Sequence, residues 1–261
     1  MGNLFFHFTV GQFTCIAIRD GDDWDRNVLL INTGQHHVLI DTGNGDATSP
    51  PGLLLDRLRM AGVAPTDIDV VILSHADFDH IGGAADASGT VAFPNARYIL
   101  PRAEWAFWAT QPERLRPSDA YDEDFRQLGH TIPQTRLAHL RDRLELIESE
   151  TEIVPGIRSV AAPGHTPGAS VIAVASDDAH LLCIGDLVYD PNDIVNPDWY
   201  SVFDYDPVQV VATRCRVLAQ AARKGTLLMA YHVPFPGLGS VAPHGQGWRW
   251  TAYEEANEIV A

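Results

Sequence analysis

The chain has 261 residues, a length that suits one large domain or two small ones. Hydrophobic residues make up 46% of it and charged residues 20%, a mixture that excludes a disordered or fibrous protein. The formal net charge is −16, so the surface repels the phosphates of nucleic acids and no nucleic-acid partner is expected.

The first third of the chain combines strands and one helix. Apolar, β-rich runs predict strands at 13–19, 28–32 and 38–41. The Ser-Pro-Pro sequence at 49–51 is typical of a helix start, and the apolar residues after it predict a helix that ends at Gly62. The run 69–74 then predicts a fully buried strand.

The rest of the chain continues this mixture. Residues 101–150 are rich in charged and aromatic residues and predict a helical insertion, with one helix near 103–109. Further strands are predicted at 157–162, 170–175, 180–184 and 226–231. An amphipathic helix is predicted over 207–223, with Val208 and Val211 on its apolar face. This order indicates an α/β or α+β fold with more than one sheet, and the lack of a linker favours a single domain over 1–261.

The cysteines and the start of the chain favour a reducing compartment. Cys15, Cys183 and Cys215 are widely spaced and form no CxxC pair, so neither a disulfide framework nor a thiolate zinc site is expected. No run approaches the roughly 20 apolar residues that span a bilayer, and the first residues lack the features of a secretory signal. We therefore expect a cytoplasmic location and no membrane association.

The most informative segment is 74–83, Ser-His-Ala-Asp-Phe-Asp-His-Ile-Gly-Gly, which follows a predicted buried strand. Side chains alternate along an extended segment, so His75, Asp77 and Asp79 are expected to project to one side, with His80 at the next turn. Imidazole and carboxylate ligands together suit zinc, iron or manganese. Taken alone, the segment is also compatible with a polar turn at a strand end.

Three further predicted strands end in a histidine or an aspartate. His165 lies in a Pro-Gly-His-Thr-Pro-Gly loop, while Asp186 and His232 each follow an apolar run. One such residue is more often structural than a ligand. Four strand ends of this kind indicate that a sheet edge gathers ligands from distant parts of the sequence into one cluster.

With these pieces in order, the chain resembles the metallo-β-lactamase-fold hydrolases, whose motifs are HxHxDH followed by His, Asp and His. The matching segments are HADFDH at 75–80, GHTPG at 164–168, GD at 185–186 and HVPFPGLG at 232–239, with LIDTG upstream at 39–43. The PGHTPG, NPDW and GWRW sequences look most like the branch that includes the N-acyl-homoserine lactonases and methyl parathion hydrolase. The resemblance implies a four-layer αββα sandwich with metals at one edge.

The resemblance also implies two divalent metal ions, with zinc as the first choice. One ion would be held by His75, Asp77 and His165, and the other by Asp79, His80 and His232, with Asp186 bridging both. Asp41, in the LIDTG segment, has two interpretations: a residue that supports the metal site from behind, or a plain turn residue.

Position 77 departs from the family pattern, because most members have histidine there. A carboxylate is harder than an imidazole, carries a charge and reaches less far, so Asp77 should shift the first site toward iron or manganese. Some family members with oxygen chemistry carry a glutamate at this position and bind two irons. A di-iron oxidoreductase is therefore the alternative to a hydrolase.

The implied reaction needs no serine or cysteine nucleophile. Two divalent ions can hold a hydroxide between them, since coordination lowers the pKa of water to roughly 7, and Asp79 would orient that nucleophile. The acidic surface and the aromatic residues favour a neutral small-molecule substrate: an ester, a lactone or a phosphotriester. Tyr189 and Phe235 are candidate substrate contacts, with packing as the alternative, and a homodimer is expected by analogy with the branch.

Overall fold

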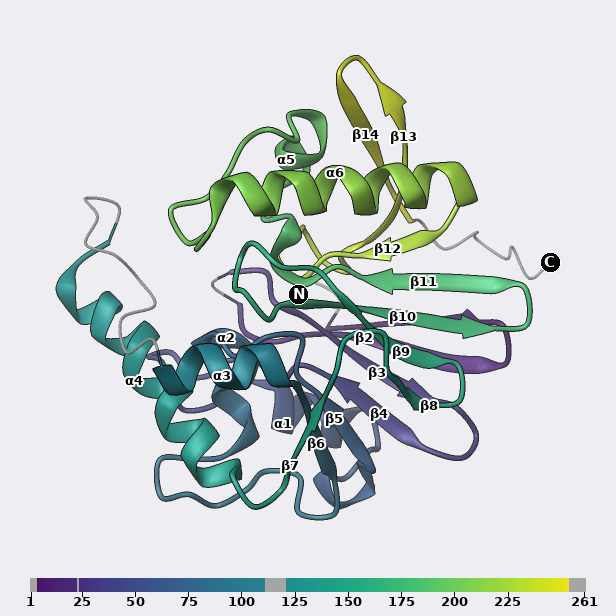
Figure 1. Cartoon of the computed structure of the whole chain (residues 1–261). Helices are drawn as coiled ribbons and strands as arrows, with labels where there is room; N and C mark the ends of the chain where they lie inside the picture. Colours follow the sequence, from purple (N-terminus) through teal and green to yellow (C-terminus); the bar gives the residue numbers. More distant parts are fainter. Residues whose placement is uncertain (1–3, 23, 111–120, 254–261) are drawn as a thin grey trace.

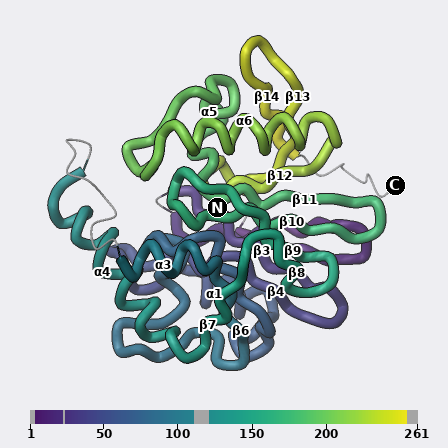
Figure 2. The backbone as a smooth tube through the Cα atoms, in the orientation of Figure 1, coloured from purple at the N-terminus to yellow at the C-terminus, as the bar shows by residue number. Residues whose placement is uncertain are grey.

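The structure is a computed structural model that describes residues 4–22, 24–110 and 121–253. Within these residues the chain forms two seven-stranded sheets that are stacked face to face, with helices on their outer faces (Figure 1). The predicted αββα sandwich is thus confirmed. The N-terminal part of the chain forms one half of the sandwich and the C-terminal part the other, as the backbone trace shows (Figure 2).

The strands of the first sheet lie side by side in the order in which the chain forms them. They are β1 (Phe5–Val10), β2 (Phe13–Arg19), β3 (Asn27–Asn32), β4 (His37–Ile40), β5 (Val70–Ile72), β6 (Arg97–Pro101) and β7 (Leu144–Ile147). The pairs from β1 to β4 are antiparallel and those from β4 to β7 are parallel.

The strands of the second sheet also lie side by side in chain order. They are β8 (Glu152–Val154), β9 (Ile157–Ala161), β10 (Ser170–Ser176), β11 (Ala179–Cys183), β12 (Leu227–Met229), β13 (Leu238–His244) and β14 (Gly247–Ala252). Its pairs are antiparallel except for β11 with β12.

Helices cover the outer face of each sheet. The first sheet carries α1 (Leu54–Met60), α2 (Phe78–Ile81), α3 (Arg102–Thr110) and α4 (Glu123–Leu140), and the second carries α5 (Pro191–Val195) and α6 (Pro207–Lys224) (Figure 1). Short 3₁₀ turns lie at Pro65–Asp67, Gly82–Ala84 and Gly185–Leu187. None of the helices in the described ranges combines the length and the apolar character that a membrane span needs.

The longest helix of the second half is α6, whose ends agree with the sequence prediction and whose buried face agrees with it in part. Asp206 caps its start by accepting a hydrogen bond from Gln209 N, and Gly225 ends it in the left-handed conformation, with φ of 64°. Val208 is 81% exposed, while Thr213 and Arg214 are buried. Leu218 is buried and Val211 and Ala222 pack against the apolar cluster, as expected. The buried face also includes Thr213 and Arg214, whose side chains donate hydrogen bonds to backbone carbonyls, which hydropathy does not register.

Three apolar clusters correspond to the layers of the sandwich. One lies between the two sheets and contains residues of both, such as Leu29 and Ile72 from the first sheet and Ile172 and Leu181 from the second. The other two join each sheet to its own helices. Because the sheets share a core, the loops at one edge of both sheets are held at fixed positions relative to one another.

Candidate metal centre

The predicted metal-ligand residues lie on four loops that come together from both sheets. The segment 75–80 follows β5 of the first sheet, whereas His165, Asp186 and His232 follow β9, β11 and β12 of the second. All seven side chains are buried or nearly so, with Asp77 the most accessible at 13%. The site thus requires both sheets.

Asp186 lies at the centre of this cluster. Its Oδ1 atom is 2.9 Å from His80 Nε2, and its Oδ2 atom is 3.4 Å from His232 Nε2 and 3.5 Å from His165 Nε2. His75 Nε2 is slightly farther away, 3.9 Å from Oδ2. One carboxylate therefore faces the imidazoles of all four histidines.

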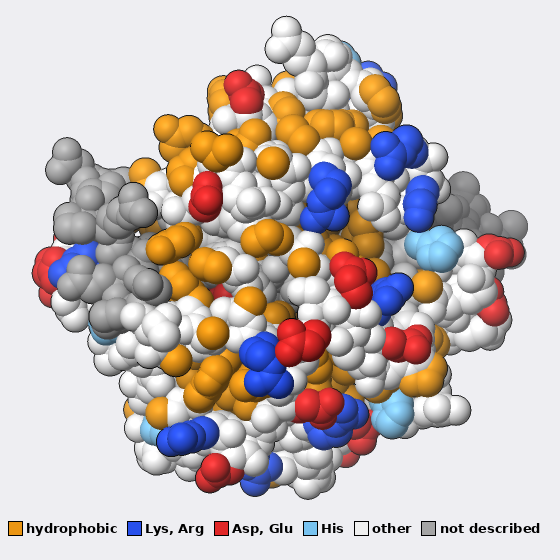
Figure 3. All heavy atoms as spheres, in the orientation of Figure 1, with side chains coloured by type: hydrophobic (Ala, Val, Ile, Leu, Met, Phe, Trp, Pro, Cys, Tyr) orange, Lys and Arg blue, Asp and Glu red, His pale blue; other side chains and the backbone are white. Residues whose placement is uncertain are grey.

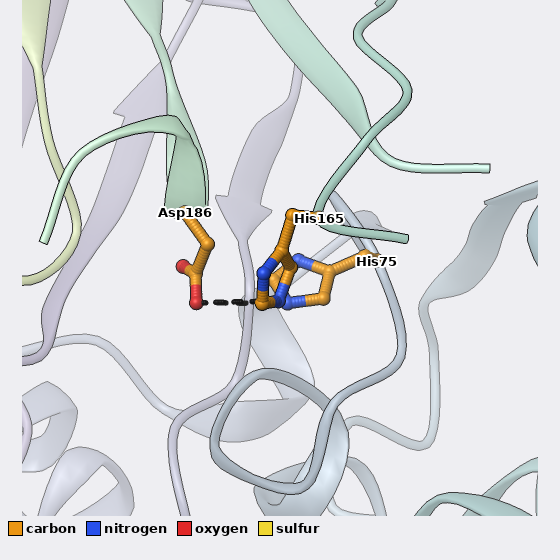
Figure 4. Close-up of side chains that lie close together, drawn as sticks. All are labelled: His75, His165 and Asp186. Atoms are coloured by element: carbon orange, nitrogen blue, oxygen red, sulfur yellow. Dashed lines mark ion pairs between the residues drawn. The ribbon is translucent and has the colours of Figure 1, made fainter. Parts of the chain in front are cut away.

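The donor atoms form two groups, each small enough to surround one ion. Within each group the potential ligand atoms lie within 4.8 Å of one another; the groups are His75, His165 and Asp186, and Asp79, His80 and His232. Figure 4 shows the first group, with the rings of His75 and His165 turned toward the Asp186 carboxylate. These are the two ligand sets that the family resemblance implies, apart from Asp77.

The segment after Asp77 does not keep the alternation of side chains that the sequence predicted. Asp77 precedes α2, and its carbonyl accepts hydrogen bonds from His80 N at 2.9 Å and Ile81 N at 3.0 Å. Asp79 and His80 therefore lie on a helical turn, so the expectation of one extended segment is wrong beyond Asp77. The Asp77 carboxylate instead reaches across to His165, with 3.1 Å between its Oδ2 atom and Nε2.

The Nδ1 atom of each histidine, which points away from the cluster, lies within hydrogen-bond distance of a group outside it. The partners are Ser74 Oγ for His75 (3.1 Å), Asp41 Oδ2 for His80 (2.9 Å), Asp204 Oδ1 for His165 (3.1 Å) and the carbonyl oxygen of Asp25 for His232 (2.9 Å). Such partners fix the ring orientation and tautomer of histidines that bind metals. They leave every Nε2 atom directed to the centre.

The histidine Nε2 atoms and the carboxylate oxygens at the centre of the cluster are better placed to bind metal ions than to hydrogen-bond with one another. In the described part of the chain, the Nε2 atoms of His75, His80 and His232 and the Oδ1 atom of Asp186 are buried without a hydrogen-bond partner. Buried polar atoms are nearly always paired, so three imidazole nitrogens and one carboxylate oxygen without a hydrogen bond require an explanation, even though His80 Nε2 and Asp186 Oδ1 lie 2.9 Å apart. Imidazole nitrogens and carboxylate oxygens are ligands of zinc and related divalent ions, and two such ions would satisfy these atoms.

Burial and neighbouring charge act in opposite directions on the titratable groups. Burial opposes the charged form of Asp186, but the imidazoles of His80 and His232 hold the pKa of its carboxyl well below the usual value. Burial also opposes the charged form of His80, yet Asp186 and its neighbours hold that pKa well above 6.5. Burial lowers the pKa of His75 and raises that of Asp79. Asp186 is therefore held anionic and His75 neutral near pH 7, the forms that bind metals, whereas a divalent ion at His80 would have to displace the proton that Asp186 holds there.

A narrow pocket that is open to solvent lies above the metal-ligand cluster, with about 370 Å³ of space when its solvent-filled mouth is included. Its described lining consists of Trp24, Asp77, Phe78, Asp79, Phe125, Gly129, Asp186, Tyr189, Phe203 and His232. Tyr189 stacks on the ring of His232 at 5.2 Å, and its hydroxyl lies 3.1 Å from His165 Nδ1. Phe235 is not part of this lining, because it packs against the core between the sheets. The structure thus brings Tyr189 to the pocket and not Phe235.

Sequence reasoning did not identify several residues that support the site. Asp41 was left with two interpretations, and the structure places its carboxylate against Ser74 and His80. Asp204 and Trp24 were not singled out at all, although Trp24 stacks on His232 at 4.1 Å. Neither has a recognisable sequence signal, since each is brought to its histidine only by the fold.

Comparisons with known proteins agree with this geometry. Residues 21–252 match the family model described as the metallo-beta-lactamase superfamily. A Bacillus sp. protein named N-acyl homoserine lactonase is 26% identical over 196 residues, covering 67% of this chain and 68% of that protein. A Mycobacterium tuberculosis protein named probable metallo-hydrolase is 30% identical over 193 residues, covering 62% of this chain and 56% of that protein.

Solved structures give the same picture over nearly the whole chain. The dizinc quorum-quenching lactonase AidC, in complex with the product N-hexanoyl-L-homoserine, aligns with a TM-score of 0.89 and 27% identity, covering 97% of this chain and 98% of that one. The hydrolase AbOPH aligns with a TM-score of 0.87 at 22% identity, covering 97% and 99%, which is a likeness of fold. These named relatives do not favour the di-iron oxidoreductase alternative.

Proposed function

Because this chain belongs to the metallo-β-lactamase superfamily and is an enzyme of the metallo-hydrolase type, we propose that it hydrolyses the ester bond of a neutral lactone. The observation that carries this proposal is the cluster around Asp186, whose carboxylate lies 2.9–3.5 Å from histidines of both groups of ligand atoms at the floor of a pocket. Relatives named as lactonases support the choice of a cyclic ester over a phosphotriester.

We assign the metal-ligand roles as the resemblance implies them, with zinc as the preferred ion. When bound, two divalent ions supply a hydroxide nucleophile at neutral pH and polarise the carbonyl group that it attacks. His75, Asp77 and His165 would hold one ion, Asp79, His80 and His232 the other, and Asp186 both. Asp79, which lines the pocket as well, would also orient the nucleophile.

Tyr189 is our candidate for a direct substrate contact. Its ring forms part of the pocket wall and its hydroxyl lies beside His165. A hydroxyl in this position can donate a hydrogen bond to the carbonyl oxygen of a substrate, where negative charge develops during attack. Phe235 has no such position, so we assign it no role in binding.

The pocket walls support a substrate whose remaining part is apolar. Trp24, Phe78, Phe125 and Phe203 supply aromatic surface, and the described lining contains no lysine or arginine that would pair with an anionic group. On the molecular surface, hydrophobic side chains also gather around the start of α6 and the connection before it (Figure 3). An acyl or aryl group attached to the lactone would be buried against the aromatic walls of the pocket.

The proposal is tested by one panel of substrates on one preparation. We expect the purified protein to open N-acyl lactones faster than aryl esters or phosphotriesters, to lose activity with a chelator, and to regain it with Zn²⁺. His232→Ala should abolish turnover, because it removes a ligand of the second ion, whereas His244→Ala, at the exposed end of β13, should not. A protein that holds two metal ions and leaves every lactone intact would refute the function.

The departure at position 77 has its own test. If Asp77 ligates the first ion, Asp77→Ala should release about one metal ion per chain, and the Asp77→His variant should bind zinc more tightly than the natural chain, since imidazole suits zinc well. Elemental analysis of protein purified without added metal measures both. Two ions retained by Asp77→Ala would show that the residue is not a ligand.

A further inference from the structure

One buried carboxylate close to the metal centre belongs to none of the motifs. Glu104 lies in the first turn of α3, and its side chain is fully buried. Its Oε1 atom accepts hydrogen bonds from Ala76 N at 3.0 Å and from Trp108 Nε1 at 2.9 Å, and its Oε2 atom accepts one from the Thr166 hydroxyl at 2.6 Å. Both oxygens are therefore engaged by donors that come from three separate segments.

Two of these segments carry ligands of the first metal group. Ala76 lies between His75 and Asp77, and Thr166 directly follows His165. The two loops meet where Asp77 Oδ2 and His165 Nε2 are 3.1 Å apart. The Glu104 carboxylate thus joins the loop of the first sheet to the loop of the second, next to their point of contact.

The backbone of α3 also packs closely against the second loop. A Cβ atom on Gly168 would lie 2.0 Å from Glu104 N and 2.4 Å from its Cα, a distance that no side chain tolerates. The glycine that ends the Pro-Gly-His-Thr-Pro-Gly loop is therefore required by the helix beside it. This contact fixes the loop against the same turn of α3 that carries the carboxylate.

The second metal group is held by different contacts. Thr42 donates from both its amide and its hydroxyl to the carbonyl oxygen of His80, each at 2.8 Å. The Tyr231 hydroxyl donates to the carbonyl oxygen of Asp79 at 2.7 Å. Glu104 has no part in these bonds, so its removal should affect the two groups unequally.

We propose that Glu104 is a positioning residue that sets the separation of the two loops and thereby the affinity of the first metal site, the one formed by His75, Asp77, His165 and Asp186. The inference rests on the metal centre of the proposed function. A carboxylate suits this place because it only accepts hydrogen bonds and three donors converge on it. Alanine would leave all three donors buried and unpaired. Glutamine would keep an oxygen for two of them and an amide that can donate to the Thr166 oxygen.

The experiment is a titration of the metal-free full-length protein with Zn²⁺ in competition with a chromophoric chelator. For Glu104→Ala we expect the dissociation constant of one of the two ions to rise by about 10- to 100-fold, the size of effect seen for groups behind metal ligands, and that of the other to change less than about twofold. Glu104→Gln should stay within about threefold of the natural protein for both ions.

The matched control is Asp20→Ala. Asp20 is also fully buried, and its carboxylate accepts hydrogen bonds from three backbone amides, those of Asn44, Leu53 and Leu54, at 2.6–2.9 Å. It also lies 3.5 Å from Arg26 Nε in a buried ion pair, which Asp20→Ala would break as well. It therefore reproduces the loss of a buried acceptor without touching the two loops. It should lower the denaturation midpoint while both zinc affinities stay within about twofold of the natural protein.

The outcomes separate this inference from the function on which it rests. A natural protein that binds fewer than two Zn²⁺ ions would overturn the proposed function. If the natural protein binds two Zn²⁺ ions, the role of Glu104 alone would be overturned by a Glu104→Ala variant whose two zinc affinities are both unchanged or are both weakened equally. A Glu104→Gln variant as weak as Glu104→Ala would show that charge, and not position, is what the site needs.

Discussion

Asp186→Asn should reduce lactone turnover by at least about a thousandfold, equivalent to about 4 kcal/mol of transition-state stabilisation. The reason is its central position, with both carboxylate oxygens facing imidazole nitrogens of the two ligand groups. An amide keeps the shape but removes the negative charge and one acceptor, so neither ion would be held tightly. Steady-state kinetics and the metal content of the same preparation measure the effect.

The control for this variant is Asp178→Asn, in the exposed turn between β10 and β11. It makes the same change of charge away from the cluster and should leave both kinetics and metal content unchanged. Full turnover by Asp186→Asn, or loss of turnover with both ions still bound at natural affinity, would contradict a role for this carboxylate in binding the metals.

The largest loss of stability is expected from Arg214→Met. The guanidinium of Arg214 is buried and donates to the carbonyl oxygens of Leu187, Pro197 and Trp199, and no ion pair to a carboxylate is found for it among the described residues. Methionine fills a similar volume but leaves three buried carbonyl groups unpaired. We expect a cost of about 3–5 kcal/mol in the free energy of unfolding, comparable to breaking a buried ion pair.

Urea denaturation measures that free energy, and Arg216→Met is the matched control. Arg216 lies two residues further along α6, is exposed, and makes a single hydrogen bond to the carbonyl oxygen of Ala161 at 2.9 Å. Its loss should cost less than about 1 kcal/mol. Equal effects of the two substitutions would mean that the buried guanidinium is not needed to hold the segments it joins.

The fold could be predicted from the sequence wherever burial follows a simple period. The run 13–19 matches β2 (Phe13–Arg19) because most of its residues are apolar and its inner side chains are buried. The ends of α6 match because capping residues mark them. The short helix α2 was not predicted, since four residues are too few to show a 3.6-residue period. Strands such as β1 and β14 were missed because they mix buried and exposed side chains at the sheet edges.

The candidate site could be predicted only to the extent that its residues end strands. His165, Asp186 and His232 were singled out on that basis, together with the HADFDH segment, and the structure brings them together. The supporting groups had no such signal. Asp204 follows an irregular loop, Glu104 lies inside a helix, and Asp25 contributes a backbone carbonyl, which no sequence pattern encodes. Their role arises from tertiary contacts alone.

The division of the site between the two sheets has a consequence for mutations far from any histidine. The loop with HADFDH belongs to one half of the sandwich and the loops with His165, Asp186 and His232 to the other, so the apolar layer between the sheets contributes to their spacing along with the polar contacts made by Glu104. A substitution in that layer that lets one sheet slide or tilt against the other would change the geometry of the ion sites without altering a ligand. We therefore expect retention of the metal ions to depend on how the two β-layers interlock, so that the interior packing serves chemistry as well as stability.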